Sequence, residues 1–142
     1  MRTDPMRRRP SRAAGGFTLV ELLIVVAIVA ILAAIANASY DSYVLRSRRA
    51  AAATCLQERA HFMERYYTTQ LSYAGAPNPA QCGADLDSFY TIAFNGTPGA
   101  KAFTLTATPI GTQQRDSKCG TLSINAQGAR TASGSGSVAD CW

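Results

Sequence analysis

The chain has 142 residues, of which 47% are hydrophobic and 16% are charged, and its formal net charge is +5. This length suits about one domain, and the apolar fraction excludes an intrinsically disordered chain. The excess positive charge is local, because residues 1–16 hold five arginines against the single acid Asp4, whereas the remaining residues carry nine basic and eight acidic side chains. The body of the chain is therefore nearly neutral, which excludes binding of polyanions through the net charge of a whole domain.

A long apolar run follows the arginines. Residues 17–36 read FTLVELLIVVAIVAILAAIA, and only Thr18 and Glu21 among them are polar. A helix of this length spans about 30 Å, the thickness of a bilayer core. Because the arginines precede the run, the positive-inside rule predicts that residues 1–16 stay in the cytoplasm and that the C-terminal body is translocated. An ordinary secretory signal has a shorter run with a small-residue cleavage site after it, whereas Gly15 and Gly16 lie before this one.

Helical spacing continues beyond the apolar run. No glycine or proline interrupts residues 17–70, so the sequence predicts one helix of about 50 residues, ending at about Thr69. Residues 17–38 form its membrane-spanning half, and residues from 39 onward form its amphipathic half. The aromatic and apolar side chains at three- and four-residue steps in the second half are expected to form a core under a sheet. They are Tyr40, Tyr43, Phe62, Met63, Tyr66 and Tyr67.

The rest of the chain reads as a loop followed by a small sheet. Residues 70–88 are rich in glycine and proline and are predicted to form a loop. Strand-like runs at 89–94, 102–108 and 120–125, with a short fourth strand near 129–132, are separated by turn sequences and predict an antiparallel meander. The serine–glycine segment 133–137 is expected to be flexible unless other contacts hold it. The predicted fold class is α+β, with a long N-terminal helix packed on a small antiparallel sheet.

Four cysteines lie in the part of the chain predicted to be translocated. An even number of cysteines outside the cytoplasm indicates disulfides, and four cysteines allow three connectivities. We favour Cys119–Cys141, which closes the tail over the last strands, and Cys55–Cys82, which anchors the loop to the helix. Each bond closes a loop worth roughly 3–3.5 kcal/mol in the chain-entropy model. A zinc site made from these cysteines and His61 is disfavoured because no ligands are closely spaced, and the sequence predicts neither a metal nor a cofactor.

The junction Gly16-Phe17-Thr18-Leu19-Val20-Glu21 resembles the signature of the type IV pilin family, which opens a hydrophobic helix. The similarity to PilE-type pilins continues at scattered points over residues 15–142, in the runs 39–43, 62–67 and 119–122 and in the final residues 140–142. This resemblance implies that residues 1–16 are a leader, that residues 39–142 form the globular head, and that a filament core contains the long helices.

The resemblance also implies how the subunit is processed and assembled. A prepilin peptidase would cut after Gly16 and methylate the new amine of Phe17. Glu21 lies one helical turn further on, and a carboxylate in hydrocarbon needs a partner. The implied partner is the Phe17 amine of a neighbouring subunit. The simpler alternative is that the Glu21 side chain extends to the membrane interface or pairs with the Phe17 amine of its own chain. The implied partners are other pilin subunits, the inner membrane, the peptidase and the assembly platform, and the filament serves adhesion and twitching motility.

Basic side chains offer two further candidate surfaces. Arg115, Lys118 and Arg130, together with Lys101, can form a basic edge that binds the DNA backbone, as in DNA-uptake pilins, although Asp116 and Asp140 dilute it and scattered surface charge explains it more simply. The triplet Arg46, Arg48 and Arg49 fits lipid headgroups, a neighbouring subunit or an ordinary solvated helix face.

An enzyme is not predicted, because the chain has one histidine, no nucleophile elbow and no phosphate loop, and Asp85 and Asp87 lie in the predicted loop without visible partners. The predicted function is a structural subunit of a type IV pilus. The alternatives are a DNA-binding pilin and a pseudopilin of type II secretion.

The sequence departs from the family at two helix positions. Many pilins carry glycine at the position of Ala30 and proline at that of Ala38, and the helix between them often melts in filaments. Alanine at both positions favours the helix by about 1 and about 3 kcal/mol relative to glycine and proline. The sequence therefore predicts a continuous helix in the isolated subunit and in the filament.

Overall fold

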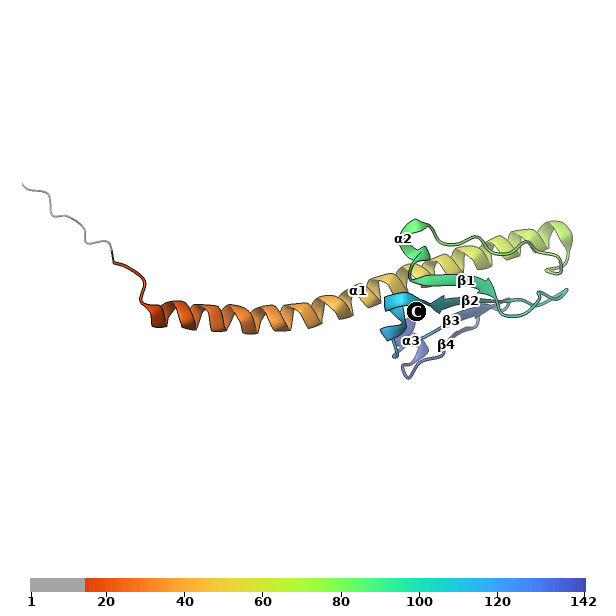
Figure 1. Cartoon of the computed structure of the whole chain (residues 1–142). Coiled ribbons are helices and arrows are strands. Elements are labelled where there is room, and N and C mark those ends of the chain that lie inside the picture. Colours follow the sequence, from red (N-terminus) through yellow and green to blue (C-terminus); the bar gives the residue numbers. More distant parts are fainter. Residues whose placement is uncertain (1–14) are drawn as a thin grey trace, which may run out of the picture. The chain divides into compact units, whose positions relative to one another are not determined.

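The computed structural model describes residues 15–142 (Figure 1). The chain divides into two compact units, the first ending at Ser39 and the second comprising Tyr40–Trp142. The predicted leader, residues 1–16, lies outside the described residues except for its last two glycines.

Helix α1 runs without interruption from Leu19 to Gln70. At its start the hydroxyl of Thr18 accepts a hydrogen bond from the backbone N–H of Glu21 at 3.2 Å, as an N-cap residue does. At its end Leu71 adopts a left-handed conformation with φ 54°, a position where glycine is usual. The predicted continuity is thus confirmed for the isolated chain, and continuity in a filament stays a prediction.

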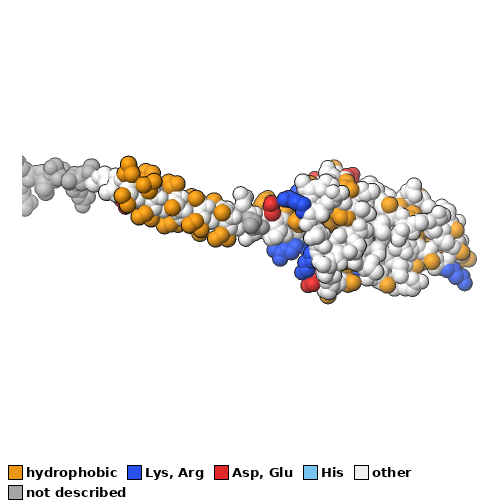
Figure 2. All heavy atoms as spheres, turned by 60° about the horizontal axis from the view of Figure 1, so that its bottom comes forward, with side chains coloured by type: hydrophobic (Ala, Val, Ile, Leu, Met, Phe, Trp, Pro, Cys, Tyr) orange, Lys and Arg blue, Asp and Glu red, His pale blue; other side chains and the backbone are white. Residues whose placement is uncertain are grey.

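The part of α1 in the first unit presents apolar side chains on every side. From Leu19 to Ile35 each large aliphatic side chain is between 50% and 78% exposed, and Figure 2 shows this segment as an almost unbroken apolar surface. Among the described helices, α1 is the one that is long and apolar enough to cross a membrane. Exposing an apolar surface of this extent to water is unfavourable, so we expect lipid or the apolar surface of another protein to cover it.

The second unit contains a four-stranded antiparallel sheet in the order β1-β2-β3-β4 (Figure 1). Successive strands pair through short connections, with Ile92 opposite Ala107, Leu105 opposite Ile124, and Ser123 opposite Thr131. The strand bounds are Tyr90–Phe94 for β1, Thr104–Pro109 for β2, Leu122–Asn125 for β3 and Arg130–Ala132 for β4. Each strand lies within or one residue beyond its predicted range, and the meander is as predicted.

The core of this unit lies between one face of the sheet and the second half of α1. Alternate strand residues such as Ile92, Leu105 and Leu122 are at most 2% exposed, and Leu56 and Met63 of α1 are equally buried. Tyr67 and Tyr73 extend the core with rings in contact at a tilted angle, with centroids 4.7 Å apart, whereas Tyr40 and Tyr43 are exposed rather than buried. The prediction of a core role is therefore wrong for these two tyrosines, because they precede the part of α1 that the sheet covers. It is also wrong for Phe62, which is 38% exposed because it lies beside residues 77–80 rather than under the sheet.

Two connecting segments carry more structure than the sequence predicts. Residues 84–87 of the expected loop form the one-turn helix α2 (Ala84–Asp87), and Leu86 of this turn is buried. Asp85 and Asp87 therefore lie on a helical turn rather than in an irregular loop. A 3-10 turn, η1 (Gly111–Arg115), joins β2 to β3.

The serine–glycine tail is held by backbone hydrogen bonds. The N–H groups of Ser133, Gly134 and Gly136 donate to the carbonyls of Thr121, Cys119 and Lys118. A side chain at Gly134 would collide with the backbone of Lys118, so only glycine permits this approach. The final helix α3 (Val138–Cys141) begins at Ser137, whose side chain caps it.

Candidate assembly and binding surfaces

The predicted processing junction, Gly16–Phe17, is exposed to solvent. Gly15, Gly16 and Phe17 precede α1, Phe17 is 80% exposed, and a side chain added at Gly16 would meet no atom within 4 Å. Glu21 lies in the first turn of α1 and is exposed, and no ion pair joins its carboxylate to another residue between 15 and 142. The backbone at the junction is thus accessible, and the carboxylate of Glu21 is available to a partner outside the described chain.

Two disulfides cross-link the second unit. Cys55 of α1 is bonded to Cys82, and Cys119 is bonded to Cys141 of α3, with Cα–Cα distances of 5.8 and 5.5 Å. These are the two pairs that the sequence favours. The first fixes the 70–88 connection to α1, and the second fixes the C-terminus beside the β2–β3 connection.

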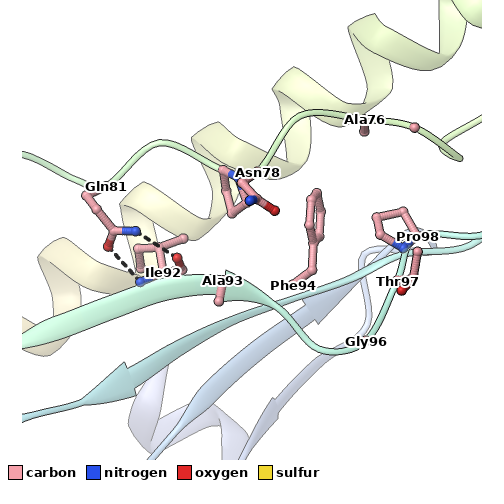
Figure 3. A pocket seen from close by; sticks show the side chains of 11 residues that line it. Ala76, Asn78, Gln81, Ile92, Ala93, Phe94, Gly96, Thr97 and Pro98 are labelled. Atoms are coloured by element: carbon pink, nitrogen blue, oxygen red, sulfur yellow. Dashed lines mark hydrogen bonds between the residues drawn. The ribbon is translucent and has the colours of Figure 1, made fainter.

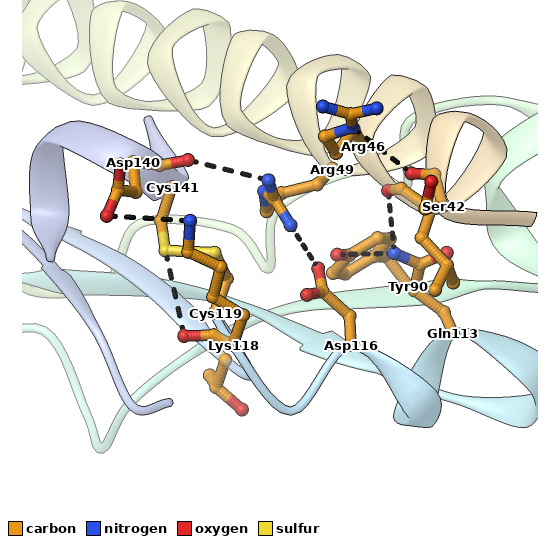
Figure 4. A network of polar contacts seen from close by, with 12 residues as sticks. Ser42, Arg46, Arg49, Tyr90, Gln113, Asp116, Lys118, Cys119, Asp140 and Cys141 are labelled. Atoms are coloured by element: carbon orange, nitrogen blue, oxygen red, sulfur yellow. Dashed lines mark hydrogen bonds and ion pairs between the residues drawn. A yellow bond between two sulfur atoms is a disulfide. The ribbon is translucent and has the colours of Figure 1, made fainter. Parts of the chain in front are cut away.

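A buried polar network joins α1 to the β2–β3 connection (Figure 4). Arg49 Nη1 lies 2.7 Å from Asp116 Oδ2, and the two side chains are 8% and 5% exposed. Arg49 Nη2 also donates to the carbonyl of Asp140 at 3.4 Å. Gln113 Nε2 donates to the carbonyl of Leu45 at 3.0 Å and to the hydroxyl of Tyr90 at 3.1 Å.

The surroundings of Arg46, Arg48 and Arg49 differ, although the sequence alone does not distinguish their roles. Arg49 is buried in the ion pair, so it is not a surface residue. Arg48 lies over the ring of Phe89, with Cζ 3.5 Å from the ring centroid, and donates to Thr112 at 3.5 Å. Arg46 is exposed, and its Nε donates to the carbonyl of Ser42 at 3.3 Å. Of the three, Arg46 is the one whose guanidinium faces solvent.

The residues of the predicted DNA-binding edge are not gathered in one place. Arg115 and Lys118 line a cleft of about 560 Å³ together with Arg46 and Arg49. Arg130 lines a separate hollow beside Gln57 and His61, and it lies over the ring of Trp142 at 5.2 Å. Lys101 lines neither hollow. It lies beside the end of α1, because the carbonyl of its neighbour Ala100 accepts a hydrogen bond from the backbone N–H of Tyr73.

Nearby carboxylates partly neutralise the charges of Arg115 and Lys118. Arg115 lies 3.7 Å from Asp41, and Lys118 lies 3.6 Å from Asp140, with all four side chains more than half exposed. A hydrogen bond from Ser137 and the charge of Lys118 lower the pKa of Asp140. Exposed pairs of this kind contribute little to stability, and their cations can exchange partners.

A further hollow, of about 590 Å³, lies between residues 75–81 and the free edge of β1 (Figure 3). Gln81 covers part of this edge as another strand would, because its side chain donates to the carbonyl of Ile92 and accepts the N–H of Ile92, both at 2.9 Å. None of the residues that line the hollow is ionisable. Residues 15–142 contain no group of three or more His, Cys, Asp or Glu side chains that could hold a metal ion.

Tyr73 gives the second unit a predicted sensitivity to alkaline pH. Burial and the carboxylate of Glu64, which accepts the Tyr73 hydroxyl at 2.9 Å, raise the pKa of Tyr73 from 10.0 to about 12. The folded state therefore keeps a proton that the unfolded state loses near pH 10, and stability falls as the pH rises from about 10 to about 12. We expect Tyr73→Phe to remove this part of the loss, measured as the difference in denaturant unfolding between the two proteins at pH 9 and pH 11.5. Equal pH dependence in both proteins would contradict the shifted pKa.

Comparison with known proteins places the chain in a family. A family model described as "Type IV minor pilin ComP, DNA uptake sequence receptor" matches residues 38–123, more than half of the chain, and a model of the prokaryotic N-terminal methylation motif matches residues 11–37. The fimbrial protein EcpC of Eikenella corrodens is 32% identical over 99 residues, which are 67% of this chain. The matched part of the chain spans 65% of the length of EcpC.

Two solved structures share the fold. A type IV pilin from Shewanella oneidensis is 26% identical, with a TM-score of 0.55, over 69% of this chain and 97% of that one. The non-core minor pilin PilV of Neisseria meningitidis is 25% identical, also with a TM-score of 0.55, over 66% and 90% of the two chains. The long helix on a four-stranded antiparallel sheet, the methylation motif and the family match agree, and the chain belongs to the type IV minor pilin family, whose members are structural subunits and not enzymes.

Proposed function

We propose that this pilin is a structural subunit of a type IV pilus. Before assembly the apolar half of α1 holds it in the inner membrane, with residues 40–142 outside the cytoplasm, and after assembly it lies in the extracellular filament. The observation that carries the proposal is the apolar surface of α1 from Leu19 to Ile35, which no described residue covers. A bilayer covers it first, and the helices of other pilin subunits replace the lipid in the filament.

Processing at the open junction prepares the subunit. A prepilin peptidase cuts after Gly16 and methylates the amine of Phe17, and the assembly platform then moves the subunit into the filament. Glu21 pairs with the Phe17 amine of a neighbouring subunit. The exposed junction supports these steps, as does the exposed Glu21, which forms no ion pair with any residue from 15 to 142, because a carboxylate in an apolar surrounding is stable only when it is neutralised.

Replacing Glu21 tests the pilus role. In a pilus-forming host, tagged Glu21→Ala and untagged wild type compete for entry into filaments. We expect about tenfold or greater exclusion of the variant, since removing the carboxylate leaves the Phe17 amine of the neighbour without a counter-charge in an apolar surrounding, which costs about 3–5 kcal/mol. Membrane levels should be unchanged. The measurement is the ratio of the two chains in sheared filaments against membranes, and intact mass should show the filament chain beginning at Phe17.

Glu58→Ala is the matched control, because Glu58 is an exposed acid of the second unit. It should enter filaments like wild type. Equal entry of Glu21→Ala and wild type would refute the pairing, and absence of the wild-type chain from filaments would refute the subunit role itself.

A second candidate function is DNA binding within the pilus. The family model carries the description of a DNA uptake sequence receptor, and this favours DNA binding over a role as a pseudopilin. The residues proposed to contact phosphates are Arg115, Lys118 and Arg130. Since Arg130 lies in a different hollow from the other two, the contact requires a duplex that reaches both hollows.

Salt dependence tests this second function. Full-length protein in detergent is titrated with duplex DNA at several salt concentrations, and two to three phosphate contacts predict a log–log slope of roughly −2 to −3. Lys118→Gln with Arg130→Gln should reduce that slope by about 2, whereas Lys101→Gln should leave it nearly unchanged. Binding that is absent, or that does not weaken as salt rises, would eliminate this function.

A further inference from the structure

We propose that the cleft beside Arg46 and Arg115 binds the phosphate headgroup of an anionic phospholipid while the subunit waits in the membrane. The lipid belongs to the same bilayer that holds the apolar half of α1. This inference rests on the proposed membrane insertion. It does not require filament assembly, and it shares Arg115 with the proposed DNA contact.

Chain connectivity places these residues near the membrane surface. The apolar run ends at Ala36, and Arg46 follows only ten residues later in the chain. Polar headgroups extend the bilayer by about 5–8 Å beyond the hydrocarbon on each side, and long arginine side chains reach back toward that layer. Tyr40 and Tyr43, which lie between, are 65% and 64% exposed. Exposed tyrosines at this position are typical of a membrane interface.

The charges of the cleft favour a phosphate. Four cations line it against the carboxylates Asp116 and Asp140, and Arg49 and Asp116 neutralise each other in their buried pair. Arg46 has no carboxylate within 4 Å among residues 15–142. Arg115 has only the exposed 3.7 Å contact with Asp41, and its Nε is held by the carbonyl of Thr112 at 3.4 Å. The guanidiniums of Arg46 and Arg115 are therefore free to form charge-assisted hydrogen bonds with a phosphodiester.

The surroundings of the cleft favour a lipid over an ordinary solvated face. Its volume of about 560 Å³ accommodates a glycerophosphate headgroup, and the fixed ion pair of Arg49 and Asp116 gives it a rigid wall. Figure 2 shows lysine and arginine side chains gathered at the end of the second unit where its part of α1 begins. Basic residues at a membrane surface attract anionic lipid by about 1 kcal/mol each.

Lipid enrichment tests the proposal with the full-length chain. The protein is reconstituted in bilayers of equal phosphatidylglycerol and phosphatidylcholine, and retained lipids are counted by native mass spectrometry. Wild type should retain phosphatidylglycerol preferentially. Arg46→Gln with Arg115→Gln should reduce this enrichment about fivefold or more, and Arg65→Gln with Lys101→Gln, an equal change in charge at exposed positions outside the cleft, should preserve it. The leader arginines are present in every variant, so they cancel in the comparison.

Several outcomes of these measurements would overturn the proposal. Unchanged enrichment in the cleft variant, or an equal loss in the control variant, shows that the cleft does not select lipid. Complete displacement by excess inorganic phosphate shows a general anion site. A cleft variant that loses duplex DNA binding while keeping lipid enrichment assigns the cleft to DNA. Vesicle flotation of all variants tests insertion separately, so failure of the membrane role is distinguished from failure of the cleft.

Discussion

Arg49→Ala should lower the free energy of unfolding by about 3–5 kcal/mol, because it leaves the carboxylate of Asp116 buried without a counter-charge. The pair is short, at 2.7 Å, and both side chains are less than 10% exposed. The substitution also removes the donor to the carbonyl of Asp140 and thus a contact between α1 and the C-terminal segment. The measurement is denaturant unfolding of the full-length chain in detergent, followed through Trp142, the single tryptophan.

Two further variants separate the ion pair from general effects. Arg65→Ala removes an exposed arginine of the same helix and should change stability by less than about 0.5 kcal/mol. Arg49→Leu combined with Asp116→Leu should cost much less than Arg49→Ala, since an apolar pair of similar volume leaves no charge buried alone. A loss below about 1 kcal/mol for Arg49→Ala would show that water reaches Asp116.

The helix and the sheet are predictable because local patterns determine them. The absence of glycine and proline from residues 17–70 fixes α1, and alternation such as Phe103, Leu105 and Ala107 against threonines fixes β2 and its buried face. The sequence favours the observed disulfide partners among three possible connectivities, because each pair joins a predicted element to a segment expected to be a loop or a flexible tail. At these positions local propensity and tertiary packing favour the same structure.

The buried network is not predictable, because its partners are far apart in sequence and chemically ordinary. Arg49 and Asp116 are 67 residues apart, and in the sequence Arg49 is one of three arginines that look alike. The tertiary contacts of Gln113 and Asp116 with α1 cover Arg49, whereas Arg46 stays exposed. For the same reason the sequence groups Arg130 with Arg115 and Lys118, whereas the β3–β4 register carries Arg130 to another hollow.

The α2 turn and the ordered tail also depend on tertiary contacts. Leu86 is the apolar anchor of α2, and one buried leucine among acids and glycines gives no helical period. The serine–glycine tail resembles a flexible linker in composition, yet Gly134 and Gly136 are the residues that allow it to lie against Lys118. Glycine in this tail therefore serves close packing rather than mobility.

Removing the second disulfide, by Cys119→Ala with Cys141→Ala, should destabilise the chain by about 3 kcal/mol. The bond closes a loop with a sequence separation of 22, for which the chain-entropy model gives about 3.4 kcal/mol. The structure adds a local consequence. Cys141 ends α3, and its neighbour Asp140 supplies the carbonyl that Arg49 contacts and the carboxylate that Lys118 faces. Without the bond, hydrogen bonds still hold the tail, among them those donated by the backbone N–H groups of Ser133, Gly134 and Gly136 and by the indole of Trp142.

The matched comparison is Cys55→Ala with Cys82→Ala. This variant opens a loop with a similar sequence separation of 27, between α1 and the segment that follows it. The model gives nearly the same entropic loss for both. They should differ in where the native state loosens. Hydrogen exchange should accelerate at residues 117–121 and 133–141 in the first variant and at residues 71–83 in the second. Equal protection of the 133–141 backbone in the first variant and wild type would show that the glycine-mediated packing on Lys118 is sufficient, and that the disulfide acts only on the unfolded chain.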